Sequence, residues 1–438
     1  MSFFAYKNGE MQAEGVTIKK IAAQVGTPFY CYSAGALRQG MREFQDGMKT
    51  SLKGRRASVC YAMKANSNLA VIKLLGEMGA SVTKVERPGS GDPFRQHPDS
   101  DNSPFFLAFN RNKRSLVLDY AQPEGLAVLH ELIQQYDILV INVRPGTEEK
   151  IGIGAGQLQK LNPRLIHCSI TGFGADGPYA KRPAFDGVGQ TLSGLLSRFH
   201  EGDDPRVAGT AMCDSLTGIF ACMGMLGALH ERNHTGKGRK VEVNMLEVGL
   251  AFAIEPLTHY LVLGEPPPFF YRGSASQAYI LRCKDGKRIG LHMSSPEKFW
   301  EGLAKTIERP DLLTRYPTRK QKMDHYEDIG RELAAAFATR NRDEWAPLLV
   351  ANDVPFAPER TMDEVADDPQ VKHLNIFNEM QHPQFGTQRA INRPWRFDGD
   401  NFSAYLPPPV MGQHSDDILA EAGVSRERIA ALRNKKIL

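Results

Sequence analysis

The sequence of 438 residues is poor in cysteine and carries almost no excess charge. Its six cysteines form no C-x-x-C pair and no dense disulfide framework, so a disulfide-stapled fold is excluded and a reducing cytoplasm is the expected compartment. The formal net charge is +4 and no dense Lys/Arg block occurs, which argues against nucleic acid as a partner. The twelve histidines form no ligand-like cluster, and no metal is expected.

Long hydrophobic runs and a targeting segment are also missing. The longest apolar stretches, Ile219–Leu229 and Leu246–Leu263, are interrupted by Gly, Glu, Pro or His, so no membrane-spanning helix is expected. The first ten residues lack a cationic start followed by an apolar core, which argues against a signal peptide. The balance of 42% hydrophobic and 24% charged residues is typical of a globular protein and excludes a disordered chain.

Short β-branched runs alternate with helical patterns from Ala57 onward. This alternation predicts an α/β fold, in which a parallel sheet is covered by helices on both faces. Strands are expected at Ser58–Met63, Ser81–Val85, Ser115–Asp119, Asp137–Asn142, Arg164–Ile170 and Lys240–Asn244. Helices are expected at Leu69–Met78, Pro123–Tyr136, Val188–Leu196 and Ser215–Arg232.

The pattern changes after Leu246 and indicates a second, smaller α+β domain. One long helix is expected to run to about Leu263, followed by a proline-rich linker, a strand–turn–strand over Tyr279–Met293 and a last helix near Ser415–Ala422. The predicted organisation is an N-terminal segment 1–56, a large domain 57–248, a linker 249–270, a small domain 271–375 and a return to the large domain over 376–438.

Glycine-rich loops follow two of the predicted strands, at 87–92 and 142–146. Neither is a P-loop, and no G-x-G-x-x-G opens a helix after a strand, so each loop alone favours a plain turn. Asp214 and Ser215 stand at the expected start of a helix. Chemistry alone favours a helix N-cap there, and the alternative is a carboxylate nucleophile beside backbone amide donors.

Taken together and in order, several segments resemble the class III CoA-transferases. This family includes formyl-CoA, carnitine and bile-acid CoA-transferases and the 2-methylacyl-CoA racemases, and the match covers approximately residues 81–438. The segments that carry it are Lys84–Asp92, Asn110–Ser115, Asn142, Arg144–Gly146, Leu161–Arg164, Gly172–Tyr179, Thr235–Arg239 and Gly412–Ser415. The resemblance implies a Rossmann-like large domain, a smaller domain and a homodimer of two interlocked chains.

The resemblance also implies which residues act. It makes Asp214 the nucleophile that carries CoA as an aspartyl thioester between an acyl-CoA and a carboxylic acid, with CoA as substrate and product and no other cofactor. Asp186 matches an acidic position that helps to hold the reacting carboxyl group, and Asn66 stands in the loop that supplies a polar side chain near the reacting carbonyl. The residues expected near CoA are Ala65, Arg87, Lys113, Asn142, Val143 and Lys150.

Departures from the family pattern leave alternatives open. Phe185 stands where the racemases have a proton-transferring histidine, so racemisation is a distant alternative. Ala121 replaces a common basic residue near the nucleotide and Val143 a common aromatic, so a catalytically impaired CoA-binding protein is the other alternative. Tyr271–Ala275 is expected in the wall of the substrate pocket, although its sequence does not name the acid.

Residues 4–79 resemble a different family, the beginning of diaminopimelate decarboxylase, in which Lys64 matches the Schiff-base lysine. The rest of that barrel has no counterpart, so no decarboxylase is expected and the sequence predicts a fusion of two families joined near 78–81. We expect Ser58–Met63 to replace the missing first strand of the sheet and Leu69–Met78 the missing first helix, because an absent central strand would leave buried backbone groups unpaired.

Overall fold

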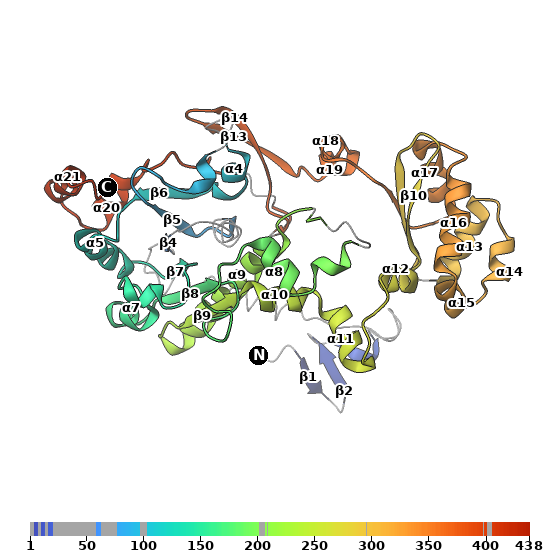
Figure 1. The fold of residues 1–438 in the computed structure, drawn as a ribbon, viewed down its shortest axis with the longest axis horizontal. Coiled ribbons are helices and arrows are strands. Elements are labelled where there is room, and N and C mark those ends of the chain that lie inside the picture. The colour runs from blue at the N-terminus through green and yellow to red at the C-terminus, as the bar shows by residue number, and fades with distance from the viewer. Residues whose placement is uncertain are drawn as a thin grey trace. The chain divides into compact units, whose positions relative to one another are not determined.

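The computed structural model describes residues 4–7, 10–13, 16–20, 58–62, 77–96, 103–200, 206–207, 209–294, 296–396, 398–400 and 405–438 (Figure 1). The chain divides into two compact units. The first comprises residues 1–194, 207–251 and 379–438, and the second comprises residues 195–206 and 252–378. The segment 195–206, which the sequence placed in the large domain, therefore belongs to the second unit, and the predicted linker 249–270 is divided between the two.

Six parallel strands form the main sheet of the first unit. They are β4 (Ser58–Ala62), β5 (Ser81–Glu86), β6 (Lys113–Val117), β7 (Ile138–Ile141), β8 (Ile166–Thr171) and β9 (Lys240–Asn244). Their order across the sheet is β6-β5-β4-β7-β8-β9, and every neighbouring pair is parallel. Numbered from its own first strand, this is the 3-2-1-4-5-6 order of a Rossmann fold. The predicted fold class is confirmed.

Strand β4 occupies the centre of this sheet. It pairs with β5 from Ser58↔Ser81 onward and with β7 from Val59↔Ile138 onward. The expectation that this segment supplies the first strand of the sheet is therefore confirmed. The helix expected after it, Leu69–Met78, lies outside the described residues except for its last two positions, and the fusion of two families stays a prediction.

Helices cover both faces of the sheet, because successive strand residues point to opposite sides (Figure 1). Ile138 and Val140 share a buried core with α9 (Met212–Thr235). Leu139 and Ile141 share the other core with helices α5 (Pro123–Ile133), α7 (Ala155–Leu161), α20 (Ser415–Glu421) and α21 (Arg426–Asn434). These four strand residues are at most 2% exposed, as expected of a sheet buried on both faces.

Helix α9 is long and apolar enough to cross a bilayer by length and composition, contrary to the expectation from its sequence. A core helix passes the same test, and Ala221, Cys222, Met225 and Ala228 of α9 pack in the core of the sheet. The feature therefore carries no membrane assignment.

The remaining elements of the first unit are short. Strands β1 (Phe4–Lys7), β2 (Glu10–Ala13) and β3 (Val16–Thr17) form a small antiparallel sheet. The short helices are η1 (Pro93–Arg95), α4 (Pro104–Asn110), α6 (Thr147–Lys150), α8 (Asp186–Leu192) and α10 (Met245–Phe252). Strands β13 (Phe377–His382) and β14 (Gly386–Ile391) pair where the chain returns from the second unit.

The second unit combines a three-stranded antiparallel sheet with helices. The sheet contains β10 (Ala278–Arg282), β11 (Arg288–His292) and β12 (Phe356–Pro358). A turn at Asp285 and Gly286 joins the first two strands, in agreement with the strand–turn–strand predicted over Tyr279–Met293. Trp300, Phe337 and Trp345 lie in its core. The helices are η2 (Leu196–Arg198), α11 (Ile254–Leu263), α12 (Tyr271–Ser276), α13 (Pro296–Thr306), α14 (Asp311–Arg315), α15 (Arg319–Asp324), α16 (Tyr326–Phe337), α17 (Arg342–Ala351), α18 (Met362–Val365) and α19 (Pro369–His373).

The single long helix expected up to Leu263 is wrong. The chain forms two helices, α10 and α11, which meet at Ala253 with a bend of 74°. Pro256 explains the break, because proline has no backbone N–H and its ring collides with the carbonyl four residues earlier, here that of Phe252 at the end of α10. Pro256 is tolerated in the first turn of α11, where intrahelical donors are not needed.

The expectation that the helix near Ser415 is the last one is also wrong. Helix α21 follows after Gly423, with Ser425 as its N-cap accepting a hydrogen bond from the backbone N–H of Arg428. Ile429 and Leu432 of this helix are buried against the sheet core. The serine cap followed by apolar residues at helical spacing is a signal that the sequence analysis missed.

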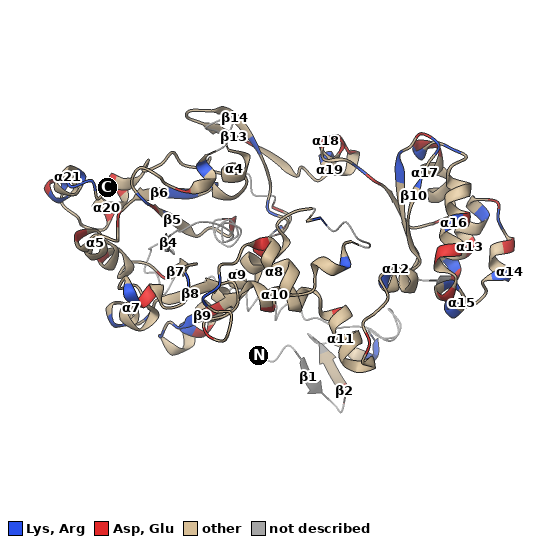
Figure 2. Ribbon diagram, viewed as in Figure 1, with Lys and Arg blue, Asp and Glu red and all other residues tan. Residues whose placement is uncertain are grey.

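Acidic and basic residues are interspersed along the ribbon of each unit (Figure 2). Many of them form ion pairs within one unit, as Arg428 with Glu131 and Arg309 with Asp311 do. This mixed distribution agrees with the small net charge of the sequence.

Candidate active site at the carboxyl edge of the parallel sheet

The strand order reverses between β4 and β7, and open α/β sheets bind ligands at the carboxyl edge beside such a reversal. Asn142 and Val143 directly follow β7 at this point; Asn142 is half-buried and Val143 is buried. Arg87 directly follows β5 and is exposed, and Lys150 is exposed at the end of α6. Four of the residues expected near CoA therefore follow the carboxyl ends of β5 and β7.

Arg87 lies close to a buried phenol. Tyr120 follows β6 at the same edge and is 5% exposed. Burial raises the pKa of Tyr120, and the positive charge of Arg87 opposes part of that rise. The Tyr120 hydroxyl has no hydrogen-bond partner among the described residues, so a neutral donor stands next to an exposed guanidinium.

Lys113 does not join this group. It is the first residue of β6 and pairs in register with Val82, near the start of β5, so it lies at the amino edge of the sheet. Its side chain is buried, and its Nζ donates to Oδ1 of Asn110 at 3.0 Å. The structure therefore does not bring Lys113 together with Arg87, Asn142, Val143 and Lys150, and its expected contact with CoA stays a prediction.

Two further predicted residues, Ala65 and Asn66, lie outside the described residues. Their expected roles stay sequence-based predictions.

Helix α9 brings its first turns past the carboxyl edge. Near its end, Arg232 donates to the side chain of Asp137 at 2.8 Å and to the carbonyl of Arg164 at 3.0 Å, and these two residues precede β7 and β8. The end of α9 therefore lies at the amino edge. Its 24 residues extend about 36 Å, roughly twice the length of a strand of six residues.

Asp214 stands in the first turn of α9 and meets Asp186 from α8. The backbone N–H of Asp214 donates to Oδ1 of Asp186 at 3.0 Å. Ala211 at the N-cap of α9 offers no side-chain acceptor, so Asp186 supplies the cap from another helix. Both carboxyl side chains are half-buried. The structure thus brings together the two aspartates that the sequence singled out.

The second oxygen of Asp186 is held by a residue that the sequence analysis missed. Gln190, one turn further along α8 and fully buried, donates from Nε2 to Oδ2 of Asp186 at 2.5 Å. Spacing of four residues on a helix favours such a contact. The Asp–x–x–x–Gln spacing could have suggested it.

Glycines allow helices α8, α9 and α10, the first two of which carry Asp186 and Asp214, to approach one another closely. A Cβ atom at Gly189 would lie 3.3 Å from the Cβ of Cys213 and 3.2 Å from that of Met245. A Cβ atom at Gly249 would lie 3.4 Å from the Sγ of Cys213. The backbones that carry Asp186 and Asp214 are therefore fixed by direct packing.

The thiol beside Asp214 is not a competing nucleophile. Cys213 is fully buried, and burial raises the pKa of its thiol to about 11, with the nearby carboxylates of Asp186 and Asp214 adding to the rise. A thiol with that pKa stays protonated near neutral pH, and the thiolate is the reactive form. Phe185, which precedes Asp186, is 56% exposed and has no group that could carry a proton.

The charged residues of the 84–92 motif serve the fold. Lys84 pairs with Asp92 at 2.5 Å, and Glu86 pairs with Arg95 at 2.7 Å while accepting a hydrogen bond from Ser115 at 2.6 Å. The backbone N–H of Gly412 donates to the same Ser115 hydroxyl at 2.8 Å. Three separate motifs thus meet in one buried network beneath the loop that begins at Arg87.

A cavity of about 360 Å³ opens at the carboxyl ends of β8 and β9. Its wall includes Ser169 and Thr171 of β8, Asn244 of β9 and residues 173–176 of the glycine-rich loop. Asn244 donates to Glu247 at 2.7 Å, so part of this wall is already hydrogen-bonded. Over the described part of the chain, no group of three or more His, Cys, Asp or Glu residues is arranged to hold a metal.

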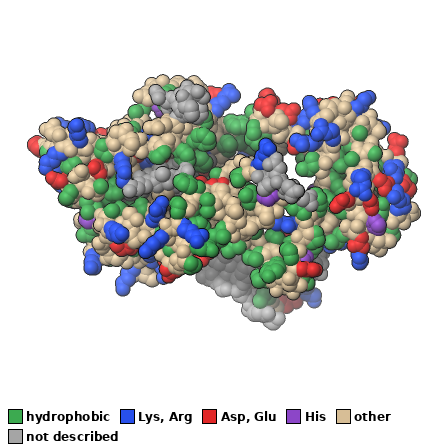
Figure 3. All heavy atoms as spheres, in the orientation of Figure 1, with side chains coloured by type: hydrophobic (Ala, Val, Ile, Leu, Met, Phe, Trp, Pro, Cys, Tyr) green, Lys and Arg blue, Asp and Glu red, His purple; other side chains and the backbone are tan. Residues whose placement is uncertain are grey.

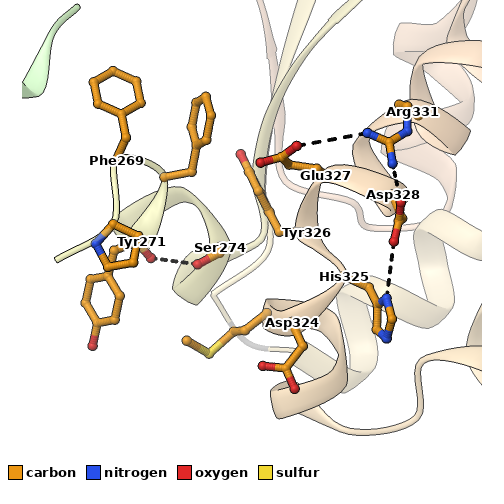
Figure 4. Close-up of a pocket in the computed structure, with 12 residues that line it drawn as sticks. Phe269, Tyr271, Ser274, Asp324, His325, Tyr326, Glu327, Asp328 and Arg331 are labelled. Atoms are coloured by element: carbon orange, nitrogen blue, oxygen red, sulfur yellow. Dashed lines mark hydrogen bonds and ion pairs between the residues drawn. The ribbon is translucent and has the colours of Figure 1, made fainter. Parts of the chain in front are cut away.

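A larger cavity, of about 590 Å³, lies within the second unit (Figure 4). Phe269, Tyr271 and Ser274 line one side of it and Tyr326 the other. Arg331, at the right of the view, pairs with Glu327 and Asp328. Tyr271 and Ser274 belong to the segment expected in the wall of the substrate pocket.

Comparisons with known proteins agree with this architecture. The model of CoA-transferase family III matches residues 68–415. Succinyl-CoA:glutarate CoA-transferase from Mus musculus is 30% identical over 389 residues, which cover 84% of this chain and 88% of the relative. Formyl-CoA:oxalate CoA-transferase from Escherichia coli O157:H7 is 31% identical over 420 residues, which cover 88% and 99%.

A solved structure shows the same fold. The crystal structure of a CaiB/BaiF family protein from Brucella suis matches with a TM-score of 0.73 at 26% identity, covering 84% of this chain and 98% of that one. Together with the relatives and the matched residues, this shows, as the sequence motifs predicted, that the chain belongs to CoA-transferase family III.

Proposed function

We propose that the protein moves CoA from an acyl-CoA thioester to a carboxylic acid through a covalent intermediate on Asp214. The observation that carries the proposal is the position of Asp214, half-buried in the first turn of a helix that extends past the carboxyl edge, with its backbone N–H bonded to a second carboxylate. The relatives support the reaction class, since both are named for transfer between a CoA thioester and a dicarboxylic acid.

The first half-reaction consists of two substitutions. An oxygen of Asp214 attacks the thioester carbonyl, the C–S bond breaks, and CoA thiolate leaves behind a mixed anhydride. The thiolate then attacks the Asp214 carbonyl carbon, which releases the donor acid as a carboxylate and leaves an aspartyl-CoA thioester. The acceptor carboxylate attacks that thioester, and the same two steps in reverse give the new acyl-CoA and free Asp214.

The surroundings of Asp214 suit this chemistry. The N-terminal end of a helix favours negative charge, and α9 contributes that field where oxyanions would form. Asp186 would fix the first turn of α9 and help to hold the reacting carboxyl group. Asn66 stays a predicted donor to the reacting carbonyl.

CoA would bind across the neighbouring loops. Its phosphates need cations, and Arg87 and Lys150 are exposed basic residues in the loops after β5 and β7. Asn142 and Val143 would contact the pantetheine arm where the strand order reverses. Ala65, expected in the same region, stays a prediction.

We further propose that a second copy of the chain covers exposed apolar side chains. Helix α11 has no buried residue, and Ile254, Leu261, Val262 and Leu263 are each more than 60% exposed. Apolar side chains gather at the surface over α11 (Figure 3). Helix α9 also exposes Met223, at 60%. Exposed patches of apolar side chains are typical of surfaces that bind another protein chain.

The test is to trap the intermediate. The protein is incubated with a panel of acyl-CoAs that includes succinyl-CoA and formyl-CoA, and the peptide that contains Asp214 is weighed with and without hydroxylamine. We expect an adduct of CoA or acyl mass that hydroxylamine converts to the hydroxamate at Asp214. A panel that yields neither adduct nor hydroxamate would contradict the proposal, and stabilisation by CoA alone would then indicate a binding protein without transfer.

A further inference from the structure

Gln190 makes the second contact to the carboxylate that caps α9. It is fully buried, and its Nε2 lies 2.5 Å from Oδ2 of Asp186, while Oδ1 of Asp186 accepts from the backbone of Asp214. We propose that Gln190 is a positioning residue for Asp214, acting through Asp186. This inference rests on the proposed function, in which Asp214 is the nucleophile.

The direction of each hydrogen bond follows from the chemistry of the groups. A carboxylate only accepts, so the Gln190 amide must present its nitrogen to Asp186. Its own Oε1 is left without a hydrogen-bond partner among the described residues. A buried acceptor without a partner destabilises a fold. Stability alone therefore does not explain a buried glutamine whose Nε2 is hydrogen-bonded and whose Oε1 is not.

Two donors on two oxygens fix the plane of the Asp186 carboxylate. If Asp186 accepted only from the N–H of Asp214, its side chain could rotate about its own bonds, and the hydrogen bond that caps α9 would change position with it. Gln190 and Asp186 both lie on α8, which packs against Cys213 through Gly189, so the contact from Gln190 holds the carboxylate side chain against that helix. The first turn of α9, and with it the attacking oxygen of Asp214, is then held to the accuracy that covalent catalysis needs.

The experiment measures the rate of adduct formation at Asp214 under single-turnover conditions, together with the Kd for CoA. Gln190→Glu removes the donor and places a second carboxylate against Asp186. Gln190→Met keeps length and volume without the donor, and it carries the test where the glutamate variant does not fold. We expect the rate to fall about tenfold in Gln190→Met and about a hundredfold in Gln190→Glu, since small misplacements of reacting groups have effects of this order.

A pairwise exchange separates positioning from stability. In an Asp186→Asn background, the new amide can accept from Asp214 N–H through its oxygen and donate through its nitrogen to the carboxylate that Gln190→Glu introduces. The Gln190→Glu change should therefore raise the adduct rate in that background, although it lowers the rate in the wild type. Cys222→Ala, a core change two turns further along α9, is the matched control; it should lower the melting temperature with little effect on the adduct rate and none on the Kd for CoA.

The possible results distinguish the positioning role of Gln190 from the proposed function of Asp214. An adduct rate in both Gln190 variants equal to that of the wild type would overturn the positioning role and leave the proposed function intact. A rate loss that Cys222→Ala matches, or a Gln190→Glu effect of the same sign and size in both backgrounds, would also overturn it. A wild-type protein that forms no adduct would overturn the proposed function itself.

Discussion

Two regions of the first unit hold aspartate side chains in different surroundings: the buried network beside residues 87–95 and the aspartate pair at the start of α9. In the network, Lys84 and Asp92 have fully buried side chains and pair at 2.5 Å. At α9, the Asp186 carboxylate accepts from the backbone N–H of Asp214 and from the amide of Gln190. Asp186 and Asp214 are both half-buried.

The different surroundings of these carboxylates distinguish residues that hold the fold together from residues that could take part in a reaction. A buried carboxylate paired with a cation has its charge neutralised and is closed to substrate, so it can only organise the chain. A half-buried carboxylate held by neutral donors keeps part of its surface accessible. The Lys84–Asp92 segment therefore organises the chain, whereas the segment that contains Asp214 is the one that we propose to react.

The largest expected effect is on the nucleophile. Asp214→Asn should lower CoA transfer by about 10⁴-fold or more, because the amide cannot form the anhydride and removal of a covalent nucleophile has effects of this order. Exchange of a labelled acid into acyl-CoA measures it. Asp417→Asn, another aspartate in the first turn of a helix, is the control and should leave transfer unchanged. Equal activity of the two variants would contradict the comparison.

The network should respond in stability and not in chemistry. Asp92→Asn leaves the Lys84 ammonium buried without its carboxylate and should cost about 3–5 kcal/mol in the free energy of unfolding, measured with urea. Transfer per folded molecule should not change. Lys435→Met, which breaks an exposed pair with Glu124, should hardly change stability. Lost transfer with unchanged stability in Asp92→Asn would place this network in the chemistry.

A smaller effect is expected at the edge of the loop that the network supports. Arg87→Ala should weaken CoA binding about tenfold, because one charge-assisted hydrogen bond contributes roughly 1.5 kcal/mol. Titration calorimetry with CoA measures the change. Lys160→Ala, which removes an exposed cation on α7, is the control. A Kd for CoA that Arg87→Ala leaves unchanged would remove Arg87 from the proposed site.

The smallest effect is expected at the thiol next to the nucleophile. Cys213→Ala should keep transfer within a few-fold of the wild type and lower stability by about 1 kcal/mol through a small cavity. Because the pKa of Cys213 is raised to about 11, iodoacetamide at pH 8 should leave this thiol unmodified in the folded protein. Loss of the covalent adduct in Cys213→Ala would shift the nucleophile from Asp214 to Cys213.

The sheet could be predicted from the sequence because its signal is local. Buried parallel strands are short apolar runs, and each predicted strand overlaps the observed one, as Lys240–Asn244 shows without any shift. The central place of β4 was also accessible, since a missing strand would leave its neighbours unpaired. The helix break at Ala253 was missed because the apolar pattern continues across the bend, although Pro256 indicated a break.

The site could be predicted only in part. Motifs identified Asp186 and Asp214, but not that one caps the helix of the other, because that contact joins residues 28 positions apart. Gln190 was missed because an amide inside a helical pattern has no chemistry until its partner is known. Lys113 was expected near CoA from the resemblance alone, and the structure shows it at the start of β6, on the opposite edge of the sheet from Arg87 and Asn142.

Isotope transfer tests the central claim most directly. The protein is allowed to turn over with an acyl-CoA and an acceptor acid labelled with ¹⁸O in its carboxylate, and the peptide that contains Asp214 is then weighed. The proposed steps leave the bridging oxygen of the acceptor on the aspartate, so the account predicts ¹⁸O in Asp214 only when both substrates are present. Product formation without label in that peptide would contradict it.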